Sequence, residues 1–214
     1  MKRAMRFWYW LACLTIEWLS RIFCGLRVTG REHLPEPPFI VAANHISLFD
    51  PPILGAVIPY EGAFMAKVEL FQKPILAPVI RSLNAFPVRR GALDREAIAR
   101  ALETLRAGRA LMLFPEGTRD KSGGPVRPAK LGVGLFAVSS GLPVVPAYIH
   151  GTDRFRSALL RRPRFSVTFG PAFMPPSPPE GDAAARRAAY EEVANTWHAR
   201  VTAMRDATIA ARPR

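Results

Sequence analysis

Cysteine and histidine are scarce in this chain. Its 214 residues include two cysteines, Cys13 and Cys24, and four histidines. Two cysteines are too few for a disulfide framework, and they suggest no metal site. We therefore expect a protein of a reducing, cytosolic-side environment that holds no metal.

Acidic residues are also few, because 17 Asp and Glu stand against 30 Lys and Arg, which gives a net charge of +13 and a pI near 10.9. Such a balance favours an anionic partner: a nucleic acid, a lipid surface or a phosphorylated substrate. General surface charge is an alternative source for part of the excess. A chain that is 49% hydrophobic is not extensively disordered, and its length favours one domain with a sizeable core.

Long hydrophobic runs are absent. The uninterrupted apolar run near the N-terminus ends after ten residues, at Glu17. A membrane-spanning helix needs roughly 20 mostly apolar residues, so we expect none here. A signal peptide would have a small-residue cleavage site after this run, where bulky aromatics stand instead.

The N-terminal segment, residues 1–26, holds three of the four tryptophans. On a helical wheel its charged residues fall within an arc of about 100°; they are Lys2, Arg3, Arg6, Glu17 and Arg21. The opposite face is apolar and carries Met5, Trp8, Leu11, Ile16, Trp18, Leu19, Ile22 and Phe23. We expect a helix that anchors the protein in the membrane interface through Trp8, Trp18, Ile22 and Phe23. The alternative is an amphipathic helix packed on its own domain.

Residues 27–214 alternate between apolar runs and helical patterns, which is typical of one α/β domain with a mixed sheet covered by helices. Strands are expected near residue 28 and at 39–43, 62–67, 85–88, 110–114, 142–149 and 165–169, the last alternating as an edge strand does. Helices are expected at 51–57, 94–106, 131–140 and about 182–212. The proline-rich residues 171–179 indicate a linker.

A histidine and an aspartate stand five residues apart at the junction of the first buried strand and the helix after it. Asp50 could fix the tautomer of His45 through one ring nitrogen and leave the other free as a general base. Asp50 before Pro51 is also an ordinary helix start, with Asp as N-cap and Pro at the first helical position. The local pattern does not separate the two readings.

Charged residues follow other predicted strands as well. Lys67 ends one strand, Arg89 and Arg90 follow another, and the segment from Glu116 to Arg119 follows a third. Ligands of open α/β sheets bind at such strand ends, and lysine with arginine there would suit a phosphate. Each of these residues could also be an ordinary surface charge.

Four ordered blocks of the sequence resemble the glycerolipid acyltransferases of the 1-acylglycerol-3-phosphate acyltransferase family. The blocks are Asn44-His45-x-x-x-x-Asp50, Lys67-Val68-Glu69-Leu70 with Phe86-Pro87-Val88-Arg89-Arg90, Phe114-Pro115-Glu116-Gly117-Thr118-Arg119, and Val145-Pro146-Ala147-Tyr148-Ile149. The resemblance covers roughly residues 27–170.

This resemblance implies that His45 removes a proton from a glycerol hydroxyl, which attacks the thioester of acyl-CoA or acyl-carrier protein, while Asp50 supports the histidine. It also implies that Glu116, Gly117, Thr118 and Arg119, with Lys67 and Arg90, bind the acceptor's glycerol phosphate. The expected acceptor is lysophosphatidic acid, the product phosphatidic acid, and no cofactor is needed. The expected location is the cytoplasmic face of the cell membrane, peripheral or monotopic.

Two positions depart from the family pattern. Asn84 stands where the family often has glycine, and Arg89 stands where an acidic residue is common. His150 and Asp153 form a second, less typical His/Asp pair, while His33 and His198 are expected at the surface or in packing. Another lysophospholipid or a lyso-aminolipid remains an alternative acceptor. A basic nucleic-acid-binding protein is a remote alternative, because the aromatics are not interleaved with the basic residues.

Overall fold

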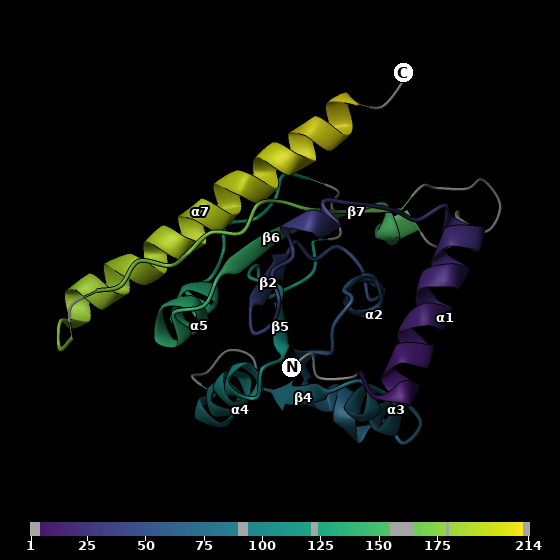
Figure 1. Cartoon of the computed structure of the whole chain (residues 1–214), viewed down its shortest axis with the longest axis horizontal. Helices are drawn as coiled ribbons and strands as arrows, with labels where there is room; N and C mark the ends of the chain where they lie inside the picture. Colours follow the sequence, from purple (N-terminus) through teal and green to yellow (C-terminus); the bar gives the residue numbers. More distant parts are fainter. Residues whose placement is uncertain (1–4, 90–93, 121–123, 155–164, 179, 212–214) are drawn as a thin grey trace.

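A seven-stranded sheet forms the centre of the computed structural model (Figure 1), which describes residues 5–89, 94–120, 124–154, 165–178 and 180–211. The strand order is β1-β7-β6-β2-β5-β3-β4, and all neighbours are parallel except β6 and β7. The strands are β1 (Arg27–Thr29), β2 (Ile40–Ala43), β3 (Gly62–Lys67), β4 (Ala85–Val88), β5 (Ala110–Leu113), β6 (Val144–His150) and β7 (Ser166–Phe169). The prediction of a single α/β domain with a mixed sheet is confirmed.

Helices cover both faces of this sheet. One hydrophobic core joins the sheet to α2 and the end of α1, and a second joins its other face to α4, α5 and α7. The helices are α1 (Phe7–Cys24), α2 (Asp50–Val57), α3 (Leu76–Ser82), α4 (Arg95–Arg106), α5 (Gly132–Ser140) and α7 (Ala183–Ala210), with 3-10 turns η1 (Arg31–His33), η2 (Val68–Gln72) and η3 (Thr152–Arg154). Every residue of β2 and β5 is buried, as expected for central parallel strands covered on both faces.

The position predicted for the strand at 165–169 is wrong. This strand, β7, does not lie at the edge but between β6 and β1. Its alternation arises because Val167 and Phe169 are buried while Ser166 and Thr168 face a more open side. The edge position belongs to β1, which is three residues long and too short for its pairing to be read from a pattern.

The long C-terminal helix forms as predicted and packs on the sheet. Asp182 caps α7 by accepting a hydrogen bond from the Ala185 amide at 2.8 Å. Trp197 is fully buried, and its Nε1 donates to the Ala42 carbonyl of β2 at 2.8 Å. Because this bond reaches the strand that precedes His45, α7 supports the segment on which the predicted catalytic residues lie.

Helix α1 packs on the domain through a narrow face beside its charged arc, and not through its wide apolar face. Tyr9, Cys13 and Cys24 are its buried residues, and Gly25 ends the helix in the left-handed conformation. Glu17 forms ion pairs with Arg21 and with Arg31 of η1, both at 2.7 Å. The helix therefore contacts the domain beside its charged arc and leaves its tryptophans exposed.

Polar contacts fix the start of α1. Arg6 bonds Glu61 Oε1 with its backbone amide at 2.7 Å and its Nε at 3.0 Å, and its guanidinium reaches Asn84 Oδ1 at 2.6 Å. Asn84 Nδ2 donates to the Gly62 carbonyl at 3.2 Å. Asn84 has φ +62°, so it adopts the left-handed turn that a glycine would allow and adds contacts that glycine lacks.

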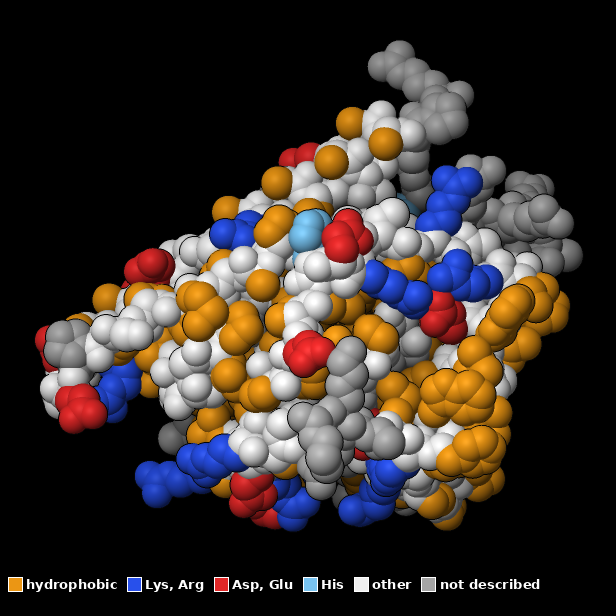
Figure 2. All heavy atoms as spheres, viewed as in Figure 1, with side chains coloured by type: hydrophobic (Ala, Val, Ile, Leu, Met, Phe, Trp, Pro, Cys, Tyr) orange, Lys and Arg blue, Asp and Glu red, His pale blue; other side chains and the backbone are white. Residues whose placement is uncertain are grey.

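The outward face of α1 forms an apolar surface, visible as the orange side chains along the right-hand edge in Figure 2. Its members expose between 45% and 74% of their area and are Phe7, Trp8, Trp10, Trp18, Leu19, Ile22 and Phe23. Met5 and Ile16, predicted on the same face, instead pack partly against the domain. Among the described residues, no helix combines the length and apolarity that crossing a bilayer requires.

Candidate active site

The predicted site residues gather at one edge of the sheet because the strands that carry them are parallel. His45 follows β2, and the segment from Glu116 to Arg119 follows β5, the neighbour of β2. Lys67 ends β3, which pairs with β5 on its other side. With strands about 4.8 Å apart, Lys67 therefore lies on a strand about 10 Å from that of His45.

His45 and Asp50 form the contact that the sequence predicts. His45 Nδ1 lies 2.8 Å from Asp50 Oδ2, and the side chains are 8% and 0% exposed. Because a carboxylate accepts hydrogen bonds, the Asp50 contact assigns the ring proton to Nδ1. His45 Nε2 then retains a lone pair that can accept a proton.

Asp50 is not a conventional helix cap. Its Oδ2 also accepts from the backbone amides of Ile46 and Ser47, each at 2.7 Å. These amides precede α2, and α2 begins at Asp50 without a side-chain cap. The carboxylate thus holds the loop between β2 and α2 in the conformation that brings His45 back onto it, so the alternative reading as an N-cap is wrong.

Two further polar residues support this loop. Asn44 is buried, donates to the Ile149 carbonyl at 2.9 Å and accepts from the Ile149 amide at 2.7 Å. Thr152, fully buried, donates from Oγ1 to Asp50 Oδ1 at 2.5 Å. Sequence reasoning assigned no role to Thr152, and nothing in its local pattern gives one, since it lies 102 positions after Asp50.

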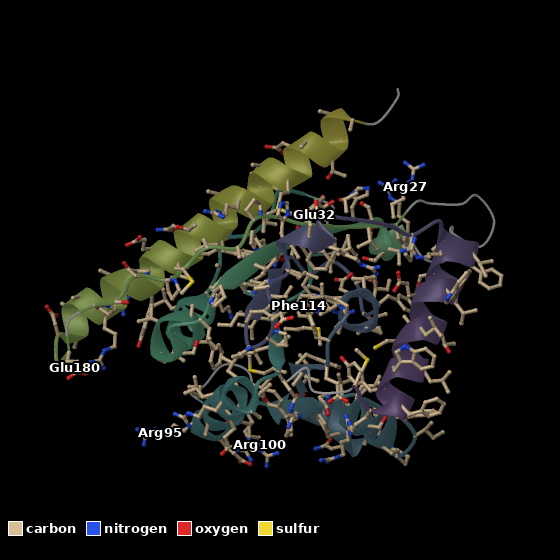
Figure 3. The ribbon with its side chains drawn as sticks, in the orientation of Figure 1. Arg27, Glu32, Arg95, Arg100, Phe114 and Glu180 are labelled. Carbon is tan, nitrogen blue, oxygen red and sulfur yellow. The ribbon has the colours of Figure 1, made fainter. Side chains whose placement is uncertain are left out.

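The loop after β5 holds His45 from the other side. The His45 ring stacks on Phe114, labelled in Figure 3, with ring centres 4.3 Å apart and planes at 29°. The Asp120 amide donates to the His45 carbonyl at 2.7 Å. Contacts from both loops thus restrict the imidazole to one orientation.

Glu116 is buried at 5% exposure, and its carboxyl hydrogen-bonds with the His45 backbone amide. Its Oε2 has no hydrogen-bond partner among the described residues. Burial raises the pKa of Glu116 to about 7, and this bond to the His45 amide opposes the rise. The carboxyl can therefore exist with or without its proton near neutral pH.

Gly117 and Lys130 touch, which sequence reasoning missed. Gly117 has φ +70°, and a Cβ added there would lie 2.8 Å from Lys130 Cε and 3.0 Å from its Nζ. The Lys130 amide also donates to the Pro115 carbonyl at 2.9 Å. Glycine at 117 thus leaves room for a lysine side chain, and the only sequence signal was one more basic residue in a polar loop.

The other residues predicted to bind phosphate, where the structure describes them, are less buried than Glu116. Lys67 and Thr118 are exposed, and Arg119 is half-buried. Arg89 is exposed, and its backbone amide donates to Asp94 Oδ2 at 2.8 Å. Arg90 lies outside the described residues.

The other histidines have structural surroundings. Asp153 lies 3.8 Å from its neighbour Arg154, and His150 Nδ1 lies 3.4 Å from the Tyr148 hydroxyl. His33 contacts the Phe169 carbonyl and His198 the Val126 carbonyl, each at 2.9 Å. None of these contacts reproduces the geometry of His45 with Asp50.

Comparison with known proteins agrees with this geometry. The sequence matches the acyltransferase family over residues 25–150. It is 32% identical over 148 residues to the 1-acyl-sn-glycerol-3-phosphate acyltransferase of Borreliella burgdorferi, covering 67% of this chain and 58% of that protein. It is 34% identical over 141 residues to the lyso-ornithine lipid O-acyltransferase of Pseudomonas aeruginosa, covering 64% and 53%.

A solved structure is similar over most of the fold. The crystal structure of the 1-acyl-sn-glycerophosphate acyltransferase PlsC from Thermotoga maritima superposes with a TM-score of 0.67 and 27% identity, over 96% of this chain and 81% of that one. The matched part of the chain spans 58% and 53% of the length of the two sequence relatives named above.

Proposed function

This chain belongs to the acyltransferase family, and we propose that it moves a fatty acyl group from a thioester donor to the free hydroxyl of 1-acylglycerol-3-phosphate, giving phosphatidic acid. The donor is acyl-CoA or acyl-carrier protein. The observation that carries the proposal is the buried His45–Asp50 contact, because it leaves one ring nitrogen free as a base.

The reaction needs one base and no covalent enzyme intermediate. His45 Nε2 takes the proton of the acceptor hydroxyl as its oxygen attacks the thioester carbonyl carbon. The tetrahedral intermediate collapses with cleavage of the C–S bond, and the imidazolium returns the proton to the departing thiolate. Asp50 stabilises the imidazolium during this cycle, and a positioned base of this kind contributes roughly 10²–10⁴-fold.

Recognition of the acceptor phosphate is proposed for the cations at the same edge. Lys67 ends β3, Arg119 follows the neighbouring strand β5, and the Lys130 side chain lies against Gly117 of the loop after β5. Arginine can bind a phosphate through two parallel hydrogen bonds, and Thr118 adds a donor. Arg90 completes the proposed set by resemblance, and Glu116 would face the glycerol part of the acceptor.

A second acceptor class is supported by one comparison. The relative that is 34% identical is named a lyso-ornithine lipid O-acyltransferase, and its name indicates an acceptor different from lysophosphatidic acid. The chemistry at His45 would be the same for both acceptors. The two acceptors differ in that the phosphate of lysophosphatidic acid requires a phosphate-binding group such as Arg119.

The acyl-transfer test uses purified protein with a radiolabelled acyl thioester, offered as acyl-CoA and as acyl-carrier protein. Wild type should acylate lysophosphatidic acid, and His45→Ala should lose this activity while keeping its circular dichroism spectrum. Arg119→Ala should raise KM for lysophosphatidic acid, whereas the matched surface variant Arg187→Ala on α7 should not. Retained activity in His45→Ala would refute the assignment.

The same assay with lyso-ornithine lipid separates the two acceptors. The proposed function is supported if kcat/KM is higher for lysophosphatidic acid than for lyso-ornithine lipid, and if Arg119→Ala lowers kcat/KM for lysophosphatidic acid only. A higher value for lyso-ornithine lipid, unaffected by Arg119→Ala, would replace lysophosphatidic acid with the second acceptor.

Attachment to the surface of an anionic bilayer is proposed for the outward face of α1, on the cytoplasmic side of the cell membrane. Helix α3 adjoins this apolar surface, because Trp8 Nε1 donates to Ser82 Oγ at 3.1 Å. Ile75, at the other end of α3, is 84% exposed. Exposed aromatic and aliphatic side chains next to basic ones are typical of helices that lie in a membrane interface.

Vesicle sedimentation tests this attachment. Ile22→Glu combined with Phe23→Glu should reduce binding to vesicles that contain anionic lipid, because both side chains are more than half exposed. Ile209→Glu on α7, which is 46% exposed, is the matched control and should bind as wild type does. Undiminished binding of the α1 variant would refute the proposal. Point changes are preferable to removing α1, since that would also delete buried Tyr9 and Cys13.

A further inference from the structure

We propose that Thr152 is a positioning residue of the acyl-transfer reaction, because its hydroxyl holds Asp50 in the orientation that serves His45. The inference rests on the proposed function and adds to it a residue outside the four sequence blocks. Its basis is the 2.5 Å hydrogen bond from Thr152 Oγ1 to Asp50 Oδ1, between two side chains with no exposed area.

The two oxygens of Asp50 have separate partners. Oδ2 accepts from His45 Nδ1 and from the amides of Ile46 and Ser47, at 2.7 to 2.8 Å. Oδ1 accepts from Thr152. Without the threonine hydroxyl, Oδ1 would lose this donor in a fully buried place, where an unpaired charged oxygen is costly.

Rotation of the carboxylate is the consequence that matters for catalysis. The torsion that turns an aspartate carboxylate is broad and is not fixed by the side chain's own rotamer preferences. Hydrogen bonds must therefore set it. The Thr152 hydroxyl is the contact that ties Oδ1 down while Oδ2 faces the imidazole.

The chain brings Thr152 to this place through the end of β6. Asn44 and Ile149 form two hydrogen bonds with each other. The end of β6 is therefore held beside the start of the loop that carries His45 and Asp50. Gly151 then reverses the chain with φ +84°, and Thr152 begins η3. A hydroxyl buried to this degree needs a partner, and the Asp50 carboxylate is its hydrogen-bond partner among the described residues.

The test compares Thr152→Val, Thr152→Ala and Thr152→Ser with wild type in the acyl-transfer assay. Valine keeps the shape and removes the hydroxyl, and the alanine and serine pair isolates the hydroxyl should valine disturb folding. Valine and alanine should lower kcat about tenfold with KM for both substrates within about twofold, because a hydrogen bond to a charged group is lost. Serine should restore kcat to within about threefold of wild type.

Thr104→Val on α4 is the matched control. Thr104 is also buried, but its hydroxyl donates to the Arg100 carbonyl of its own helix at 2.9 Å. Its kcat should equal that of wild type. Wild-type kcat in Thr152→Val and Thr152→Ala, or an equal loss in Thr152→Ser, would overturn the proposal.

A spectroscopic measurement separates failure of this inference from failure of the proposed function. The His45 Nδ1 proton bound to a carboxylate should give a downfield proton signal in the folded protein. Thr152→Val should shift or broaden that signal, while Thr152→Ser and Thr104→Val preserve it. An unchanged signal in Thr152→Val would refute the positioning role. Absence of acyl transfer by wild type would instead refute the proposed function and leave this measurement valid.

Discussion

Asp50 should have a structural role that can be measured apart from its role in catalysis. Its carboxylate accepts hydrogen bonds from the amides of Ile46 and Ser47 and from the Thr152 hydroxyl, besides that from His45. Asp50→Ala leaves the two amides and the Thr152 hydroxyl, which are buried or partly buried, without this acceptor. At about 1–3 kcal/mol for each, the free energy of unfolding should fall by about 3–9 kcal/mol. This approaches the total stability of a typical domain, about 5–15 kcal/mol.

Asp50→Asn should behave differently. Its amide oxygen can replace Oδ2 as acceptor for both backbone amides, and its NH₂ group then faces Thr152 Oγ1, which can accept. We therefore expect its free energy of unfolding to stay within about 2 kcal/mol of wild type. The negative charge that supports the imidazolium is lost, so kcat should fall about 10- to 100-fold, since about 1.4 kcal/mol corresponds to tenfold.

Urea unfolding followed by circular dichroism gives the stabilities, and the thioester assay gives kcat. Asp50→Ala should unfold at a clearly lower urea concentration than Asp50→Asn. Equal stabilities for the two variants would refute the reasoning, because they would show that the buried donors do not depend on an acceptor at this position.

Three further changes test other parts of the site and its support. Burial keeps Glu116 protonated to a higher pH in the folded protein than in the unfolded chain. The free energy of unfolding of wild type, measured in urea, should therefore fall by up to about 3 kcal/mol relative to that of Glu116→Gln between about pH 5 and pH 8. A difference that stays constant with pH would contradict this. Asn84→Ala should be about 1 kcal/mol less stable than Asn84→Gly in thermal unfolding, because alanine disfavours the left-handed φ of this position. Both variants lose the contact with Arg6, so that loss does not contribute to the difference. Equal melting temperatures would argue against strain at this position. Gly117→Ala should displace Lys130 and raise KM for a phosphate-bearing acceptor, and an unchanged KM would remove Lys130 from the proposed phosphate site.

Much of the fold could be predicted because the strands are short apolar runs and the helices carry their own caps. Asp94 and Asp182, the first residues of two predicted helices, each cap a helix that begins one residue later. The pairing of β7 with β1 could not be predicted. Strand β1 is only three residues long, and its place in the sheet depends on where the preceding helix α1 ends. The sequence pattern showed that α1 has a wide apolar arc. Only the packing shows that the domain instead contacts the face that carries Tyr9, Cys13 and Cys24.

The sequence by itself indicated the contact between the proposed catalytic residues, since His45 and Asp50 belong to one loop and are five residues apart. It also determined which strand ends carry charge. The tertiary structure decided what surrounds that pair: Thr152 from the end of β6 fixes the other Asp50 oxygen, the loop after β5 holds the imidazole, and Lys130 lies against Gly117. These contacts join segments up to 102 residues apart, and a local pattern cannot specify them because the order of strands in the sheet decides which loops meet.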